Sequence, residues 1–221
     1  MNAMEFQRWL SAHGQPVVQD GICGPKTRSA IVAAFTNPCA PSITPSDVIA
    51  LAKRLDCTVS QLAAVAEVES GGNAYDRDGR PKMLFERHLF HRLTDGRFTP
   101  AIFSNPTAGG YNLDSWQKLT LAACREVDAA FAAASWGKFQ ILGTHWSALG
   151  YATPLEMAYS AVTGEAAHYE MLARYVEVFG LKPALARLSA DPADNEAFAK
   201  LYNGPGFRRF DYHTKLAEAL A

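Results

Sequence analysis

Only one stretch of this chain, residues 73–85 (NAYDRDGRPKMLF), has a pattern typical of β-strands. It contains Asp78-Gly79, a dipeptide that favours a tight hairpin turn, and it ends in the apolar run Met83-Leu84-Phe85. Helical periodicity accounts for most of the other residues. We therefore expect a mainly α domain that carries one small β-hairpin directly after a helix.

Capping signals mark several helix starts. Thr44 is followed by Pro45, and Thr58 with Gln61 has the spacing of a capping box. The patterns predict helices over residues 4–13, 25–36, from 44 onwards, 58–70, from 85 onwards, 115–133, 155–178 with a break near Gly164, 193–202, and from 211 onwards.

A proline-rich segment, residues 37–46 (NPCAPSITPS), has no periodicity and is predicted to be a linker. It separates a small module, residues 1–40, from a larger domain, residues 41–221. A chain of 221 residues can form one well-buried domain with such an appendage, but not two full-sized enzymes.

Charge and hydropathy exclude several classes of protein. The formal net charge is −1, and no basic run is longer than Arg208-Arg209, so the footprint of a nucleic-acid-binding protein is missing. No apolar run approaches the roughly 20 residues that a membrane span needs, and the first residues lack the pattern of a signal peptide. We expect a monomer that is made in the cytoplasm and does not insert stably into a membrane.

The four cysteines, Cys23, Cys39, Cys57 and Cys124, form no Cys-x-x-Cys pair. No structural metal is therefore expected. Cys23 and Cys39 could meet within the small module, but disulfides are uncommon in proteins made in the cytoplasm. We expect four buried thiols.

One glutamate has an unusual position on the predicted helix 58–70. At about 100° per residue with Leu62 at zero, Glu69 falls near 340°, within the apolar face. Glu67 falls near 140°, on the opposite side, and is expected to be a solvated surface carboxylate. A carboxyl group among apolar side chains has a raised pKa, which suits a general acid near neutral pH. The alternative is a glutamate that only ends the helix and bonds into the turn at Gly71-Gly72.

Several ordered motifs carry a resemblance to a known family. Glu69-Ser70, residues 137–141 (Gly-Lys-Phe-Gln-Ile) and residues 202–204 (Tyr-Asn-Gly) are similar to three motifs of goose-type lysozymes and soluble lytic transglycosylases. Residues 84–88 (Leu-Phe-Glu-Arg-His) resemble the signature of the N-acetylmuramidase domain of phage endolysins. The match spans residues 45–220. It implies a lysozyme-like α+β fold that hydrolyses the β-1,4 bond between N-acetylmuramic acid and N-acetylglucosamine in peptidoglycan, without metal or cofactor.

The resemblance also implies site residues. Glu69 would donate the proton to the glycosidic oxygen. The helical wheel selects the same residue. Many glycosidases use a second carboxylate across the scissile bond. Asp78 is the first choice for it, because phage-type lysozymes place an aspartate at this spacing, and Asp76 is close enough to be an alternative.

Glu86 is a further possibility for the second carboxylate. On a helix that starts at Phe85 it falls beside the apolar Leu89 and Phe90, so it is expected to be buried. The alternative that we favour is a structural carboxylate, paired with Arg87, Arg92 or a backbone amide, that holds the hairpin under the catalytic helix.

Five residues are expected to contact the substrate: Ser70, Phe139, Gln140, Tyr202 and Asn203. Phe139 and Gln140 would line the cleft floor, and Tyr202 and Asn203 would bind the N-acetyl sugar or orient Glu69. Each residue could instead have a purely structural role. Phe139 and Gln140 would then belong to a loop packed into the core, Tyr202 and Asn203 to a helix C-cap before Gly204, and Ser70 would cap or pack.

The N-terminal module has a resemblance of its own. Phe6-Gln7, Trp9-Leu10 and residues 20–27 (Asp-Gly-Ile-Cys-Gly-Pro-Lys-Thr) are similar to the peptidoglycan-binding domain that precedes many wall hydrolases. The copy is shorter than the usual three-helix repeat. Asp20 and Gly24 are expected to form turns rather than to contact a ligand.

Two other functions remain open. A lytic transglycosylase would use Glu69 alone and leave 1,6-anhydro ends, whereas a wall-binding protein would keep the fold without turnover. Zinc-dependent peptidases are disfavoured because His88 and His91 have no matching third ligand. The resemblance to endolysins implies action on the bacterial wall, in the periplasm, after a separate protein has permeabilised the membrane.

Overall fold

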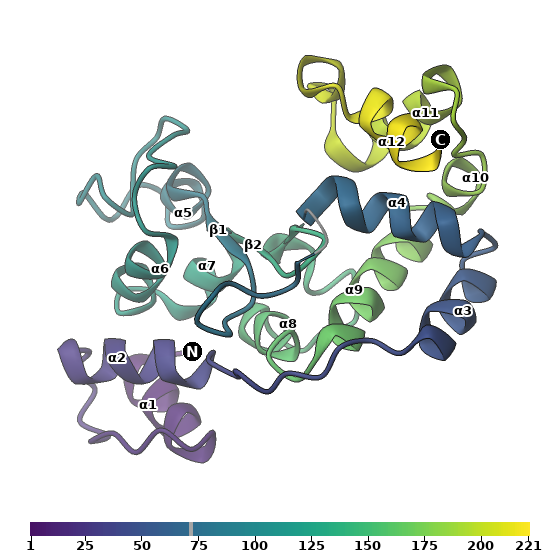
Figure 1. Ribbon diagram of the computed structural model, residues 1–221. Coiled ribbons are helices and arrows are strands. Elements are labelled where there is room, and N and C mark those ends of the chain that lie inside the picture. Colours follow the sequence, from purple (N-terminus) through teal and green to yellow (C-terminus); the bar gives the residue numbers. More distant parts are fainter. Residues whose placement is uncertain (71–72) are drawn as a thin grey trace.

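The computed structural model describes residues 1–70 and 73–221 (Figure 1). The helices are α1 (Ala3–Ala12), α2 (Pro25–Ala34), α3 (Pro45–Arg54), α4 (Val59–Ser70), α5 (Arg87–Leu93), α6 (Ser115–Ala123), α7 (Val127–Ala132), α8 (Pro154–Ser160), α9 (Glu165–Val178), α10 (Lys182–Leu185), α11 (Pro192–Asn203) and α12 (Tyr212–Leu220). Two 3-10 helices, η1 (Gly143–His145) and η2 (Phe207–Phe210), and three strands, β1 (Met83–Phe85), β2 (Ala134–Trp136) and β3 (Ile141–Leu142), complete the described elements. The predicted mainly α fold with a small β part is confirmed. Within residues 1–70 and 73–221, no helix is both long and apolar enough to cross a membrane.

Local signals set the start of the helix that carries Glu69. The Thr58 N–H donates to Gln61 Oε1 at 2.8 Å, and the Gln61 N–H donates to Thr58 Oγ1 at 3.1 Å. This reciprocal pair satisfies two amides that no helical carbonyl reaches, which confirms the predicted capping box. Thr44 caps α3 in the same way, since its Oγ1 accepts the Asp47 N–H at 3.2 Å.

The sheet differs from the single hairpin that the sequence predicts. Around Asp78-Gly79 the chain forms only an isolated bridge, between Tyr75 and Pro81. β1 pairs instead with β2, and β2 with β3, in an antiparallel sheet of order β1-β2-β3. The sequence did not predict β2 and β3, because they are too short for a clear alternation of polar and apolar residues and only their long-range pairing with β1 makes them strands.

Two predicted helices are divided in the structure. The predicted helix 115–133 breaks after Cys124 into α6 and α7, which the sequence did not predict. The predicted break near Gly164 is confirmed, and it separates α8 from α9. Gly164 has φ +152°, and a Cβ there would lie 2.9 Å from Pro41 Cγ. Both the backbone conformation and the close approach of the linker therefore require glycine at this break.

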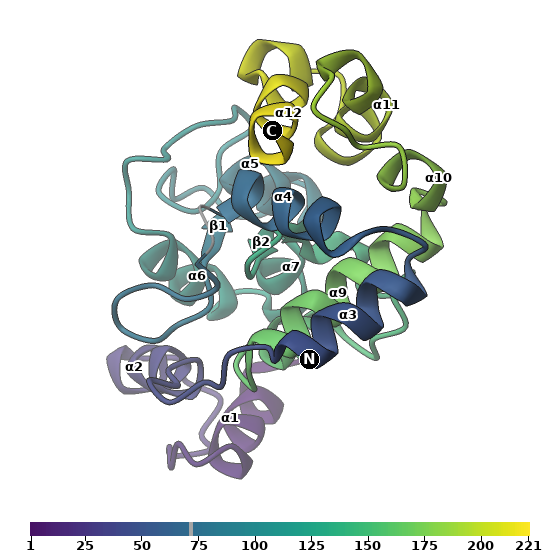
Figure 2. The ribbon, with the colours of Figure 1, turned by 45° about the vertical axis from the view of Figure 1, so that its right-hand side comes forward.

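The N-terminal module shares its core with the larger domain. The Phe35 ring, just after α2, lies 5.6 Å from Trp116, 5.5 Å from Phe131 and 5.6 Å from Trp136, measured between ring centroids. Phe6 of α1 also meets Phe131 at 5.9 Å. All five of these rings are buried. Figure 2 shows α1 and α2 beneath α6, in agreement with this continuous aromatic core.

The predicted linker is fixed along the larger domain. The Ile43 N–H donates to Glu165 Oε2 at 3.0 Å, and the Glu165 N–H donates to Pro41 O at 2.8 Å. Lys138 Nζ lies 2.6 Å from Glu165 Oε1, and both side chains are largely buried. The linker is thereby tied to α9 and to the turn between β2 and β3.

The expectation of four buried thiols was wrong. Cys23 forms a disulfide with Cys124, with a Cα–Cα distance of 5.2 Å, whereas Cys39 is exposed and free. Cys57 is a half-buried thiol, and burial raises its pKa to about 11. From the sequence, Cys39 is the only candidate disulfide partner for Cys23, because it lies in the same module. Packing of the module against α6 instead brings Cys23 to Cys124, the C-cap of α6, 101 positions away.

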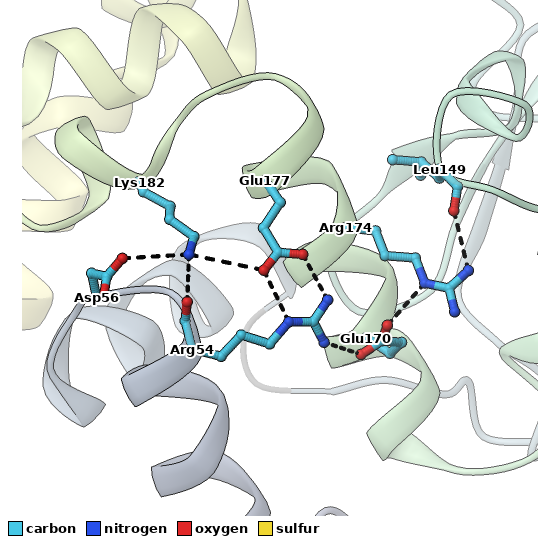
Figure 3. Close-up of polar contacts among 7 residues, drawn as sticks. All are labelled: Arg54, Asp56, Leu149, Glu170, Arg174, Glu177 and Lys182. Carbon is cyan, nitrogen blue, oxygen red and sulfur yellow. Dashed lines mark hydrogen bonds and ion pairs between the residues drawn. The ribbon is translucent and has the colours of Figure 1, made fainter.

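A network of ion pairs joins α3 to α9 (Figure 3). Arg54, at the end of α3, lies 2.6 Å from Glu170 and 2.7 Å from Glu177, and Lys182 reaches both Asp56 and Glu177 at 3.4 and 3.9 Å. The side chains are partly exposed, so each single pair contributes little to stability. Together they hold the turn from which α4 starts.

Candidate active site

A cleft of about 520 Å³ opens beside the C-terminal end of α4. Its walls come from α4, the turn before β1, β1 itself, the start of α6 and the turn between β2 and β3 (Figure 1). The lining residues are Glu69, Asp76, Arg80, Lys82, Met83, Asp114, Ser115, Trp116 and Gln140. Five of these nine residues are charged, so the cleft offers many groups that can form hydrogen bonds with a polar ligand.

Glu69 reaches this cleft from the apolar face of α4. Leu62, Val65 and Ala66 of α4 are buried, and Glu67 is exposed, as the helical wheel predicts. Glu69 itself is half-buried in the last turn of α4. The helix thus anchors one face in the core and presents this carboxyl at the cleft wall.

The surroundings of Glu69 favour its protonated form. Burial raises the pKa of Glu69 to about 7, although the hydrogen bond from Asn203 and the charge of Lys215 act in the opposite direction. The Asn203 Nδ2–H donates to Glu69 Oε1 at 2.7 Å. One oxygen is thus held by an amide, and at neutral pH a substantial fraction of the group carries a proton that it can donate.

The Tyr202-Asn203 pair ends α11 and packs under the site. Gly204 is the C-cap with φ +79°, so the helix-ending role that the sequence suggests is also present. The Tyr202 hydroxyl donates to Phe139 O at 2.8 Å. The two residues therefore connect Glu69 with the turn between β2 and β3.

That turn places its two candidate residues differently. Gln140 lines the cleft, and its backbone has a φ of +48°. Its Nε2–H donates to Gly137 O at 2.9 Å. Phe139 is only 1% exposed and packs edge-on against Tyr169. The structure therefore places Gln140 on the cleft surface and Phe139 in the core beneath it, not on the cleft floor.

The two aspartates of the turn before β1 have different surroundings. Asp76 lines the cleft, but its carboxylate accepts the N–H groups of Asp78 and Arg80 and pairs with Arg80 Nε at 2.8 Å. The Asp78 side chain is 50% exposed, pairs with Arg80 Nη2 at 2.6 Å, and is not among the residues that line the cleft. Arg80 also covers the Trp116 ring at 5.5 Å. Arg80 is thus paired with both aspartates.

Glu86 follows β1 directly and is 16% exposed. Its Oε2 accepts the Tyr111 hydroxyl at 3.1 Å and lies 3.2 Å from His88 Nδ1, outside hydrogen-bond geometry. Among the described residues, neither Arg87 nor Arg92 is ion-paired with it, so the arginine pair that we favoured in the sequence is not formed. Glu86, like Asp78, is not among the residues that line the cleft. Its neighbour Phe85 is at the cleft wall, since the Phe85 N–H donates to Oγ of the cleft-lining Ser115 at 3.2 Å.

Some cleft residues were missed by the sequence argument, and one predicted residue is not described. The start of α6 at Asp114 had a visible signal, since aspartate is a favoured N-cap and its carboxylate accepts the Trp116 N–H at 2.8 Å. Arg80, Lys82 and Met83 had none, because only the turn and the sheet bring them to Glu69. The Ser70 side chain and the Gly71-Gly72 turn lie outside the described residues.

Comparisons with known proteins agree with this arrangement. Residues 58–221 match the family described as N-acetylmuramidase, and residues 2–58 match one described as "Predicted Peptidoglycan domain". The crystal structure of the Burkholderia AP3 phage endolysin is similar to the chain with a TM-score of 0.72 and 30% identity, covering 99% of this chain and 92% of that one. No curated protein sequence matches. A family match over most of the chain, together with a polar cleft around Glu69, shows that the chain belongs to the N-acetylmuramidase family of glycoside hydrolases that act on peptidoglycan.

Proposed function

We propose that Glu69 is the general acid that cleaves the β-1,4 bond between N-acetylmuramic acid and N-acetylglucosamine. The observation that carries the proposal is a half-buried carboxyl, with a pKa of about 7, that faces a polar cleft and is held by Asn203 at 2.7 Å. In the reaction, the Glu69 proton passes to the glycosidic oxygen while the bond to C1 of the muramic acid breaks. Positive charge then develops on the sugar ring.

Glu86 is the second carboxylate of the proposed mechanism. Asp76 and Asp78 share an ion pair with Arg80, and three N–H donors occupy Asp76. Glu86 has a tyrosine hydroxyl as its only hydrogen-bond donor among the described residues, so its charge is available to stabilise the ring cation and to accept a proton from water. Water adds to C1, and the two sugars leave as separate hydroxyl-terminated products.

The products of purified peptidoglycan test this reaction. Borohydride reduction followed by mass spectrometry should find reducible N-acetylmuramic acid ends. Fragments lighter by one water that resist reduction would instead indicate a lytic transglycosylase, and an absence of fragments would indicate a binding protein.

The N-terminal module is proposed to attach the enzyme to the wall. We place its boundary at the linker, residues 37–44, because α3 packs on α4 and α9 and so belongs to the larger domain. The match of residues 2–58 to a peptidoglycan domain supports the binding role. Full-length Glu69→Gln protein should sediment with purified peptidoglycan without degrading it.

The place of action is also a proposal. We infer that the monomeric enzyme accumulates in the cytoplasm of an infected bacterium and reaches the wall from the periplasmic side once the membrane is permeabilised. The similarity to a phage endolysin supports this course of events. Fractionation of expressing cells should find the protein in the cytoplasm. Degradation of the cell wall should begin only after a membrane-permeabilising agent is added.

A further inference from the structure

The loop between α5 and α6 carries an exposed aromatic residue next to Glu86. Tyr111 is 53% exposed, yet its hydroxyl donates to Glu86 Oε2 at 3.1 Å. It lies three positions before Asp114, where the cleft-lining segment Asp114–Trp116 begins. Tyr111 thus combines an exposed apolar ring with a fixed polar end, a combination that makes tyrosine frequent at binding surfaces.

Buried groups fix the backbone on which Tyr111 stands. Lys118 of α6 is fully buried, and its ammonium group donates to Gly110 O at 3.1 Å and to Phe85 O at 3.4 Å. Gly110 has φ +73°, and a Cβ there would lie 3.0 Å from the Arg87 guanidinium. Lys118 therefore ties the loop to the end of β1, directly beside the backbone of Glu86.

The Arg87 side chain holds the same loop from the other side. Its Nη1–H donates to Ala101 O at 3.1 Å. A buried lysine and a positioned arginine are thus both used to hold one surface loop against β1. Burying a lysine has a substantial desolvation cost, so a fold that does so at this point defines the loop position closely.

From this geometry we propose that Tyr111 is a positioning and substrate-contact residue of the muramidase reaction. Its hydroxyl orients the Glu86 carboxylate, and its exposed ring provides an apolar face on which a pyranose ring of the glycan strand stacks. The inference rests on the proposed function, because it gives Glu86 a role in turnover. Tyr111 then orients the Glu86 carboxylate and supplies a sugar-binding surface beyond the cleft around Glu69.

Two substitutions separate the two roles of Tyr111. Tyr111→Phe keeps the ring and removes the hydroxyl, so kcat on soluble, uncrosslinked glycan strands should fall about tenfold, the size expected for loss of one hydrogen bond to a charged group. KM should stay within about twofold, because the ring that contacts the sugar is retained. Tyr111→Ala should show the same loss in kcat and, in addition, an increase of about tenfold in KM.

The matched control is Tyr159→Phe. Tyr159 packs against Trp9 and Phe35, and its hydroxyl makes no hydrogen bond to a residue that the structure describes, so this variant should have wild-type kcat and KM. An unchanged kcat in Tyr111→Phe would overturn the positioning role. An unchanged KM in Tyr111→Ala would overturn the stacking role.

Failure of the proposed function gives a different result. If Glu69→Gln retains activity, the mechanism itself is wrong, whatever the Tyr111 variants do. If Glu69→Gln is inactive while both Tyr111 variants behave as wild type, only the inference about Tyr111 is wrong.

Discussion

At the scale of single residues, the chemistry depends on how Glu69 is surrounded. Burial in the last turn of α4 favours the neutral carboxyl group, whereas the Asn203 amide and the Lys215 charge favour the ionised form. Burial has the larger effect, and the pKa rises from 4.5 to about 7. An acid with such a pKa is protonated often enough to donate and ionises readily after donation.

The raised pKa predicts the alkaline side of the pH profile. General acid catalysis needs protonated Glu69, so kcat/KM should fall about tenfold for each pH unit above about 7. Initial rates of release of soluble fragments, measured from pH 5 to pH 9 at constant ionic strength, test this. A rate that stays constant up to pH 9 would contradict the assigned role.

The same shift predicts how Glu69→Gln changes stability. A carboxyl whose pKa is higher in the folded than in the unfolded chain binds its proton more tightly when folded, so it destabilises the fold increasingly as pH rises from 4.5 to about 7. A neutral glutamine removes this effect. Glu69→Gln should therefore be more stable than wild type by about 3 kcal/mol at pH 8 and nearly equal to it at pH 4. Thermal or urea unfolding at both pH values measures the difference, and lower stability at pH 8 would be inconsistent with this account.

Among the other carboxylates, exposure and pairing separate Asp78 from Glu86. Asp78→Asn removes an exposed charge that is already paired with Arg80, so the rate should fall less than about threefold. Glu86→Gln removes the carboxylate that we assign to turnover, and the rate should fall at least about a hundredfold. Rates for both variants on the same peptidoglycan decide between them, and the opposite order would restore Asp78 as the second carboxylate.

At the scale of elements, α6 connects two parts of the molecule. Its first residues, from Asp114 to Trp116, form a wall of the cleft, and its C-cap, Cys124, is joined by a disulfide to Cys23 of the module. The Trp116 ring also meets Phe35 at the end of α2. The position of the cleft wall is therefore linked to the docking of the module.

Breaking the disulfide should loosen this connection. A cross-link that closes a loop of about one hundred residues restricts the unfolded chain, and its loss should lower the free energy of unfolding by about 3 to 5 kcal/mol. Thermal unfolding with and without a reductant tests this, together with the double variant Cys23→Ser/Cys124→Ser. Cys39→Ser is the matched control, since Cys39 is exposed and free. Equal melting temperatures for wild type and the double variant would show that the cross-link does not contribute.

At the scale of the whole molecule, local patterns in the sequence predicted the helices and the acid, but not the contacts between distant segments. The capping box at Thr58 and the apolar face of α4 depend on neighbouring residues, so the helix start and the direction of Glu69 followed from sequence alone. The pairing of β1 with β2 and the Cys23–Cys124 disulfide join segments far apart in the chain, and no local signal encodes them. For the same reason Arg80 and Tyr111 were not recognised beforehand.

The role of Glu69 as the acid is tested by comparing wild type and Glu69→Gln on purified peptidoglycan at pH 6, with thermal unfolding of both as a check on folding. Removal of a general acid should reduce the release of reducible ends by at least about a hundredfold, while the variant remains folded and still sediments with the wall. A folded Glu69→Gln protein that releases fragments at a rate near that of wild type would contradict the account.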